Sequence, residues 1–107
     1  MNRFAARSTP DENQADVKGW YEELWCSFVD THGCGFGTPD AVVGTAGITD
    51  WVEIKSTNGQ LEPKQIRFIR DWRGSKIVIV KTKADVINHV LNMRERASFK
   101  WGGNGKK

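Results

Sequence analysis

The sequence predicts an α/β fold in which a small mixed β-sheet is flanked by helices, in the order helix, strand, strand, helix, strand, helix. Apolar residues recur at steps of three and four in three separate segments, which is the period of a helix packed on one face. Between these segments lie three short runs rich in β-branched residues and bounded by turn-forming residues, as in strands. Strands and helices that alternate in this way favour one layered sheet.

The size and composition fit one small soluble domain. The chain has 107 residues, of which 38% are hydrophobic and 27% are charged, so wholesale disorder is not expected. The longest aliphatic run, Ile77–Val80, is far shorter than the roughly 20 residues that cross a bilayer. No apolar secretory segment follows the first residues, so we expect a cytoplasmic protein without a membrane span. We place one domain at residues 11–97, between a flexible arm at 1–10 and a flexible basic tail at 98–107.

The first helix is predicted at residues 11–29. Apolar side chains recur there at helical spacing and form one face. A Gly-rich stretch at residues 32–37 follows and cannot continue the helix. The predicted inner face consists of Gln14, Val17, Trp20, Tyr21, Leu24, Trp25 and Phe28.

Three strands are predicted after this helix. Residues 39–44 and 50–56 form the first two, and residues 45–49 form the hairpin connection between them. Residues 76–80 are almost entirely apolar, as is typical of a buried strand in the centre of a sheet.

Two further helices complete the pattern. Pro63 at a first-turn position begins a helix that extends to about Trp72. Thr82 and Asp85 resemble a capping box at the start of the last helix. The predicted inner face of that helix consists of Val86, Ile87, Val90 and Leu91.

The cysteines do not indicate a disulfide framework, because there are only two of them, Cys26 and Cys34. With His32 they offer three soft ligands, but they lack the paired spacing of a zinc site. We expect two reduced cysteines, one on the first helix and one in the Gly-rich loop.

Charge is divided unequally between the two halves of the chain. Residues 1–53 hold three basic and nine acidic residues, for a net charge of −6. Residues 54–107 hold thirteen basic and four acidic residues, for a net charge of +9. A basic half is typical of a protein that binds a polyanion, and an acidic half fits either a metal site or a solvated helix.

The candidate site consists of Asp40, Glu53 and Lys55. Glu53 and Lys55 share one face of a predicted strand, and Asp40 begins the preceding strand of the hairpin. Two carboxylates that meet repel each other unless a cation lies between them, and oxygen ligands suit Mg²⁺ or Mn²⁺. A lysine beside them can orient or deprotonate a water, or offset charge on a phosphate. This combination fits hydrolysis of a phosphodiester.

Two other functions stay open at this point. Glu-x-Lys on an exposed strand is commonly a surface ion pair, which would suit a structural or interaction protein. A catalytically silent nucleic-acid-binding module of the same fold is the other alternative.

The chain carries four motifs in the order Asp11-Glu12-Asn13-Gln14, Gly37-Thr38-Pro39-Asp40 with the strand that follows, Trp51-Val52-Glu53-Ile54-Lys55, and Leu61-Glu62-Pro63-Lys64-Gln65. Together they resemble the motifs of the PD-(D/E)xK nuclease superfamily, and most closely those of the small stand-alone VRR-NUC nucleases of phages and bacteria. The similarity extends from about Asp11 to Val90. It implies a restriction-endonuclease-like core and metal-dependent hydrolysis of DNA, by a homodimer that acts on branched DNA such as a Holliday junction.

The resemblance also implies a role for each matching residue. Asp40 and Glu53 would bind Mg²⁺ or Mn²⁺ together with the main-chain carbonyl of Ile54. Lys55 would position or activate the attacking water. Gln65 would lie at the edge of the site and steady the lysine or the phosphate.

The first motif departs from the pattern, because Gln14 stands where many relatives carry a glutamate. The glutamine removes one negative charge from this position of the site, so whether the site binds one metal ion or two stays open.

Basic and aromatic residues supply candidate contacts to nucleic acid. Trp20, Trp25 and Trp72 are predicted in the core, whereas Trp51 and Trp101 are candidate contacts with DNA or a second subunit. The candidate phosphate contacts on and after the second helix are Lys64, Arg67, Arg70, Arg73 and Lys76.

Overall fold

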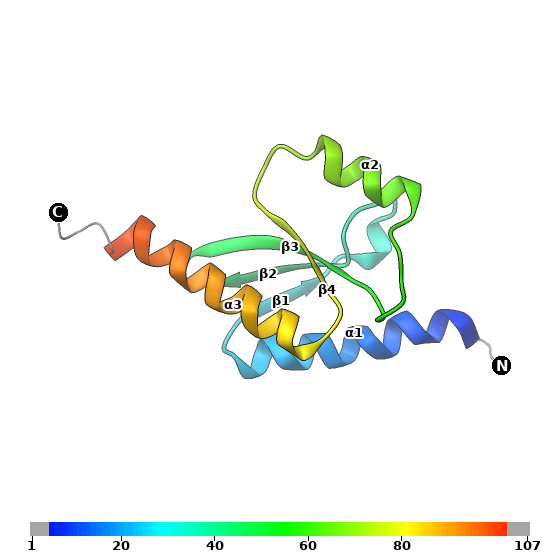
Figure 1. Ribbon diagram of the computed structural model, residues 1–107, viewed down its shortest axis with the longest axis horizontal. Coiled ribbons are helices and arrows are strands. Elements are labelled where there is room, and N and C mark those ends of the chain that lie inside the picture. Colours follow the sequence, from blue (N-terminus) through cyan, green and yellow to red (C-terminus); the bar gives the residue numbers. More distant parts are fainter. Residues whose placement is uncertain (1–4, 103–107) are drawn as a thin grey trace.

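The computed structural model describes the backbone of residues 5–102 and the side chains of residues 13–100 (Figure 1). It confirms the predicted class, a mixed sheet flanked by helices, with four strands in the order β1-β2-β3-β4. Short helical turns, η1 (His32–Cys34) and η2 (Ser98–Gly102), follow β1 and α3. The main elements are α1 (Ala5–Glu23), β1 (Ser27–Asp30), β2 (Ala41–Thr45), β3 (Ile48–Ile54), α2 (Pro63–Asp71), β4 (Ile77–Val80) and α3 (Lys83–Ala97).

The first helix differs from its predicted bounds at both ends. It begins at Ala5 and therefore includes residues 5–10 of the predicted arm. It ends at Glu23, and Trp25 takes a left-handed conformation with φ 66° that turns the chain. Ser27–Asp30, predicted as helix, instead forms β1 and pairs antiparallel with β2. Residues 1–4 of the arm and 103–107 of the tail lie outside the described residues.

The β2–β3 hairpin is confirmed, with a tighter connection than predicted. Thr45 pairs with Ile48, so only Ala46 and Gly47 form the turn. Their φ values of 54° and 82° are those of a type I′ turn, which matches the twist of the two strands.

The prediction of a central position for the third predicted strand is wrong. This strand, β4, pairs in parallel with β3 and lies at the edge of the sheet, and β3 and β2 are the inner strands. Val80 is buried, whereas Ile79 is 40% exposed. The strand is apolar because one of its faces packs on the core, not because both faces are buried.

One face of the sheet carries the core, and α1 and α3 cover it (Figure 1). The inner face of α3 differs from the prediction, because Ile87 and Leu91 are exposed and His89 and Met93 are buried instead. Thr82 and Asp85 do form the predicted capping box. The core consists of Val17, Tyr21, Cys26, Ala41, Val43, Val52, Ile54, Val80, Val86, Val90 and Met93.

The tryptophans divide differently from the prediction. Trp25 is 88% exposed because α1 ends before it, and Trp72 is 38% exposed. Trp20 packs against the core as predicted. Trp51 packs edge-on against Phe68 and Trp72 of the α2 segment, with ring centroids 5.9 and 5.6 Å apart. This aromatic cluster joins α2 to the sheet face opposite the core.

A buried polar network lies between the core face of β3 and α3. The Tyr21 hydroxyl is 2.7 Å from His89 Nδ1, and His89 Nε2 is 2.8 Å from Asp50 Oδ2. Arg96 also donates to the Asp50 carboxylate. Burial alone would raise the pKa of Asp50, but the hydrogen bonds from His89 and Arg96 outweigh it and hold that pKa below its usual range.

Among the described residues, no helix is long and apolar enough to cross a membrane.

Candidate active site

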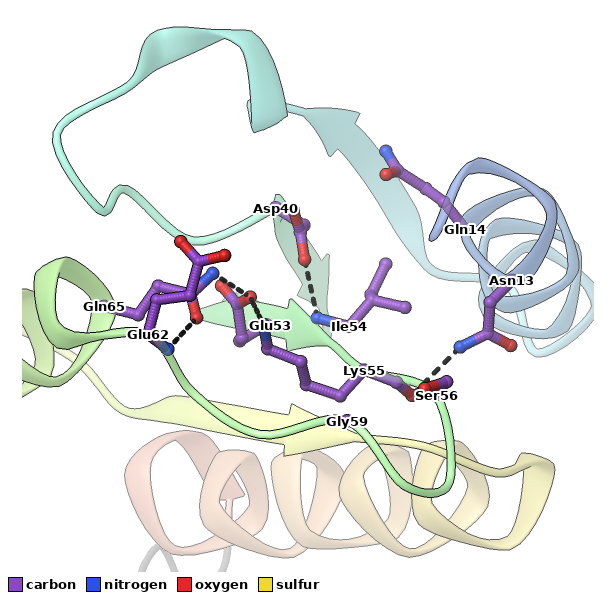
Figure 2. A pocket seen from close by; sticks show the side chains of 10 residues that line it. All are labelled: Asn13, Gln14, Asp40, Glu53, Ile54, Lys55, Ser56, Gly59, Glu62 and Gln65. Atoms are coloured by element: carbon purple, nitrogen blue, oxygen red, sulfur yellow. Dashed lines mark hydrogen bonds and ion pairs between the residues drawn. The ribbon is translucent and has the colours of Figure 1, made fainter. Parts of the chain in front are cut away.

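The hairpin register brings Asp40 next to the end of β3. Ala41 pairs with Val52, so Asp40, one residue earlier, lies level with Glu53. Asp40 Oδ2 accepts a hydrogen bond of 2.8 Å from the Ile54 amide (Figure 2). The strand pairing therefore places both carboxylates at one end of the sheet, as the spacing of the two motifs predicts.

Glu53 is held by groups from two different elements. This residue is only 2% exposed, and its side chain lies on the sheet face opposite the core. Gln65 Nε2 of α2 donates a 2.8 Å hydrogen bond to Glu53 Oε2, and Lys55 Nζ is 3.6 Å from the same oxygen. Gln65 Oε1 in turn accepts from the Glu62 amide at 2.8 Å, which fixes the amide orientation of Gln65. The first turn of α2 thus sets the direction of the Glu53 carboxylate (Figure 2).

Burial makes ionisation of the two carboxyl groups costly. Burial first, and then the neighbouring Asp40 charge, raise the pKa of Glu53 to about 7 against the opposing effect of Lys55. Burial also raises the pKa of Asp40, although the hydrogen bond from Ile54 opposes this. A divalent cation between the two carboxylates would relieve both costs, so this pair fits such an ion.

The main-chain carbonyl of Ile54 faces the same side as the carboxylates. In a strand, the amide and carbonyl of one residue point to the same edge, and the Ile54 amide points to Asp40. The Lys55 amide points the other way and donates to Val80 O at 3.0 Å. The candidate ligand set is therefore two carboxylates and one carbonyl.

This ligand set suits Mg²⁺ or Mn²⁺ better than zinc. Within residues 13–100, no group of three or more His, Cys, Asp or Glu side chains could hold a metal ion. Mg²⁺ is commonly held by one or two carboxylates, with waters and substrate phosphates as its other ligands. The number and kind of the protein ligands match that pattern.

The candidate residues line one pocket of about 300 Å³. Lys55 lies on the same face as Glu53, as predicted, and Gln14 on α1 lies across the pocket from Gln65 (Figure 2). The residues that line the pocket are Asn13, Gln14, Asp40, Glu53, Ile54, Lys55, Ser56, Gly59, Glu62 and Gln65.

Asn13 is a member of this site that the sequence did not single out. Its Nδ2 donates to the main-chain carbonyl of Lys55 at 3.0 Å, which ties the end of β3 to α1. The only signal for it in the sequence is its place beside Gln14 in the first motif. Asn13 fixes the backbone that carries the lysine.

The predicted phosphate contacts differ in their surroundings. Lys64 and Arg67 lie on α2 and line a groove beside the pocket. Arg70 is paired with Asp71 at 2.8 Å, and Lys76 Nζ donates to Asn92 of α3 at 3.3 Å. Of these five residues, Lys64 and Arg67 line the groove, and Arg73 is exposed just after α2.

Comparison with known proteins identifies the fold. No protein-family model and no curated protein matches this sequence. A solved structure described as a VRR_NUC domain superposes with a TM-score of 0.58 at 25% sequence identity, over 77% of this chain and 94% of that one. That structure suggests a nuclease domain, in agreement with the resemblance of the four motifs. The chain therefore adopts a VRR-NUC-like nuclease fold with a restriction-endonuclease-like mixed sheet.

Proposed function

We propose that this protein is a divalent-metal-dependent endonuclease that hydrolyses phosphodiester bonds of DNA. The observation that carries the proposal is the convergence of Asp40, Glu53 and Lys55 on one pocket of a VRR-NUC-like fold. A surface ion pair between Glu53 and Lys55 would not require a glutamate that is 2% exposed beside a second carboxylate.

Asp40, Glu53 and the Ile54 carbonyl would hold Mg²⁺ or Mn²⁺. A bound ion of this kind would polarise the phosphate and lower the pKa of a bound water. Lys55, beside Glu53, would orient the attacking water and offset the charge that develops on the phosphate. Gln65 would keep the Glu53 carboxylate in its ligating direction through their hydrogen bond.

The proposed substrate is double-stranded or branched DNA. Lys64 and Arg67 would contact its phosphates beside the pocket, in a manner that does not depend on base sequence. By resemblance, we also propose that a homodimer acts on DNA junctions in the cytoplasm of a bacterial or phage-infected cell. Sedimentation of the purified protein tests the dimer directly.

A cleavage assay tests the activity. Supercoiled plasmid, linear duplex and a four-way junction are incubated with the protein in Mg²⁺, in Mn²⁺ or in EDTA. We expect metal-dependent cleavage by the wild type and a loss of about 100-fold or more in Asp40→Ala and Lys55→Ala. Lys83→Ala, which removes an exposed lysine from the start of α3, is the matched control and should cleave normally.

The two alternative functions give different results in the same assay. Salt-sensitive DNA binding without cleavage would replace the proposal with a catalytically silent binding module. If the protein neither binds nor cleaves DNA, the remaining reading is that the ion pair between Glu53 and Lys55 is structural.

A further inference from the structure

The loop between β1 and β2 presents one aromatic side chain to solvent. Phe36 is 89% exposed. It has φ 60° and lies between Gly35 and Gly37, whose φ values are 76° and 77°. A bulky residue in the left-handed region is uncommon, so the backbone here adopts an unfavourable conformation that holds the ring outward.

This loop is fixed in place rather than free to fold over the ring. The Thr38 hydroxyl donates to Gly35 O at 2.6 Å, which closes the turn around Phe36. A Cβ atom at Gly37 would lie 2.2 Å from the main-chain oxygen of Lys64, so the loop backbone packs directly on the first turn of α2. Figure 1 shows this loop, in cyan, against α2.

Phe36 forms one wall of a groove of about 400 Å³ on the surface of α2. Phe68 and Trp72 add aromatic surface, with their rings stacked at 5.5 Å. Lys64 and Arg67 supply positive charge, and the acidic residue of the groove, Asp71, is already paired with Arg70. The groove therefore combines aromatic faces with a net positive charge.

The groove adjoins the proposed catalytic pocket. Lys64 lines the groove, and the next residue, Gln65, lines the pocket and bonds to Glu53. A DNA strand held in the groove would therefore contact the same helix whose Gln65 bonds to Glu53.

We propose that this groove binds an unpaired nucleobase of the DNA substrate, stacked on Phe36, with the adjoining phosphates at Lys64 and Arg67. Aromatic rings beside basic side chains are the usual means of binding single-stranded nucleic acid without regard to sequence. An apolar protein partner would gain nothing from the two positive charges, so the charge favours a nucleic acid. The inference rests on the proposed function and specifies its substrate as DNA with unpaired nucleotides next to the cleavage position.

Binding measured in EDTA, where no cleavage occurs, tests the groove separately from catalysis. Fluorescence anisotropy compares a duplex that has a short single-stranded overhang with a fully paired duplex of the same length. We expect Phe36→Ala to weaken binding of the overhang DNA about tenfold and binding of the paired duplex less than about twofold. Phe36→Tyr retains the ring and should bind both DNAs as the wild type does.

Trp25→Ala is the matched control. Trp25 is also an aromatic residue with positive φ and is 88% exposed, but it lies beyond the opposite end of β1 from Asp30 and the candidate pocket. Trp25→Ala should change neither the affinity for the overhang DNA nor that for the paired duplex. Replacing the unpaired nucleotides by abasic residues should weaken wild-type binding as much as Phe36→Ala does, and the two changes together should add nothing further.

Several outcomes overturn the inference. One is that Phe36→Ala weakens the affinity for both DNAs equally. Another is that it changes neither affinity, as expected if a protein occupies the groove. The third is that Trp25→Ala weakens the affinity for overhang DNA as much as Phe36→Ala does. The plasmid assay separates the two proposals. If the wild type cleaves DNA but Phe36→Ala does not change the preference for overhang DNA over paired DNA, only the groove proposal is refuted. If Phe36→Ala changes that preference but the wild type does not cleave, only the nuclease proposal is refuted.

Discussion

Gln65 has an unusual position among the residues of the site, because one side chain connects the start of α2 to a buried carboxylate. It accepts from Glu62 and donates to Glu53, so its amide cannot turn over without losing both hydrogen bonds. The glutamate that it holds is also next to Asp40 and Lys55. The residues of the site therefore restrain one another, and each can be tested by a readout of its own.

Replacing Gln65 should separate DNA binding from cleavage. Gln65→Ala removes a hydrogen bond to a charged group, which contributes about 1.5–3 kcal/mol. We expect cleavage in Mg²⁺ to fall about tenfold to 100-fold while the affinity for DNA in EDTA stays within about twofold. Gln60→Ala, at an exposed position in the loop before α2, is the control and should behave as the wild type. An equal loss of binding and cleavage would contradict the role given to Gln65.

Glu53 should make the stability of the metal-free protein depend on pH. Burial and the neighbouring Asp40 charge together raise its folded-state pKa to about 7, from an ordinary value of 4.5, so the folded protein binds more protons than the unfolded chain between these values. Stability in EDTA should therefore fall as the pH rises from about 4.5 to 7, by on the order of 1–3 kcal/mol. Urea unfolding across this range measures it.

Glu53→Gln provides the comparison, because a neutral amide has no proton to lose. The variant should show a smaller fall in stability over the same pH range, and Mg²⁺ should stabilise the wild type more than the variant. A wild-type protein whose metal-free stability rises through this range would contradict the proposed charge arrangement.

At the level of the elements, the sequence predicted best what local chemistry determines. The hairpin, α2 from Pro63 and the capping box at Thr82 each depend on neighbouring residues, and all three are confirmed. Strand β1 was missed because Phe28 continues the helical spacing of α1, and only pairing with β2 makes Ser27–Asp30 a strand. Tertiary hydrogen bonding there overrides a local pattern.

The same reasoning explains which parts of the site could be predicted. Asp40, Glu53 and Lys55 meet because strand alternation and hairpin length determine their positions, and both can be read from the chain. Asn13 contacts Lys55 from 42 residues away, and Phe36 depends on how its loop docks on α2. Contacts of this kind follow from packing between elements, which residue spacing does not specify.

The network between β3 and α3 should account for much of the stability of the core. Asp50 is fully buried and accepts from both His89 and Arg96, so Asp50→Ala leaves two donors without their acceptor. We expect a loss of about 3–5 kcal/mol in the free energy of unfolding at neutral pH, measured in urea. The pKa of Asp50 is held low, so its contribution is complete above the ordinary carboxyl range and is lost as the pH falls through the lowered value.

Asp71→Ala is the control for this substitution. Asp71 is also paired with an arginine, but both side chains are more than half exposed and solvent screens the pair, so the change should cost far less stability than Asp50→Ala. Equal losses in the two variants would contradict a special contribution from the buried network.

Across the whole molecule, the fold brings together the two halves of the chain that differ in charge. The acidic half supplies Asp40 and Glu53, and the basic half supplies Lys55, Lys64 and Arg67. Around the candidate site, an acidic pocket therefore lies beside a basic groove. For the proposed DNA substrate, this arrangement would concentrate the phosphate backbone next to carboxylates that would otherwise repel it.

The salt dependence of DNA binding should identify which basic residues touch phosphates. Each phosphate contact releases a counterion, so Lys64→Ala and Arg67→Ala should each reduce the slope of log affinity against log salt concentration by about 1. Lys76→Ala should leave the slope unchanged, because Lys76 is directed to Asn92 of α3 and away from the pocket. Titrations of a fully paired duplex in EDTA at several salt concentrations measure all three slopes. If Lys76→Ala changes the slope as much as the α2 variants do, DNA lies along the sheet edge rather than across α2, and the proposed path to the carboxylates is wrong.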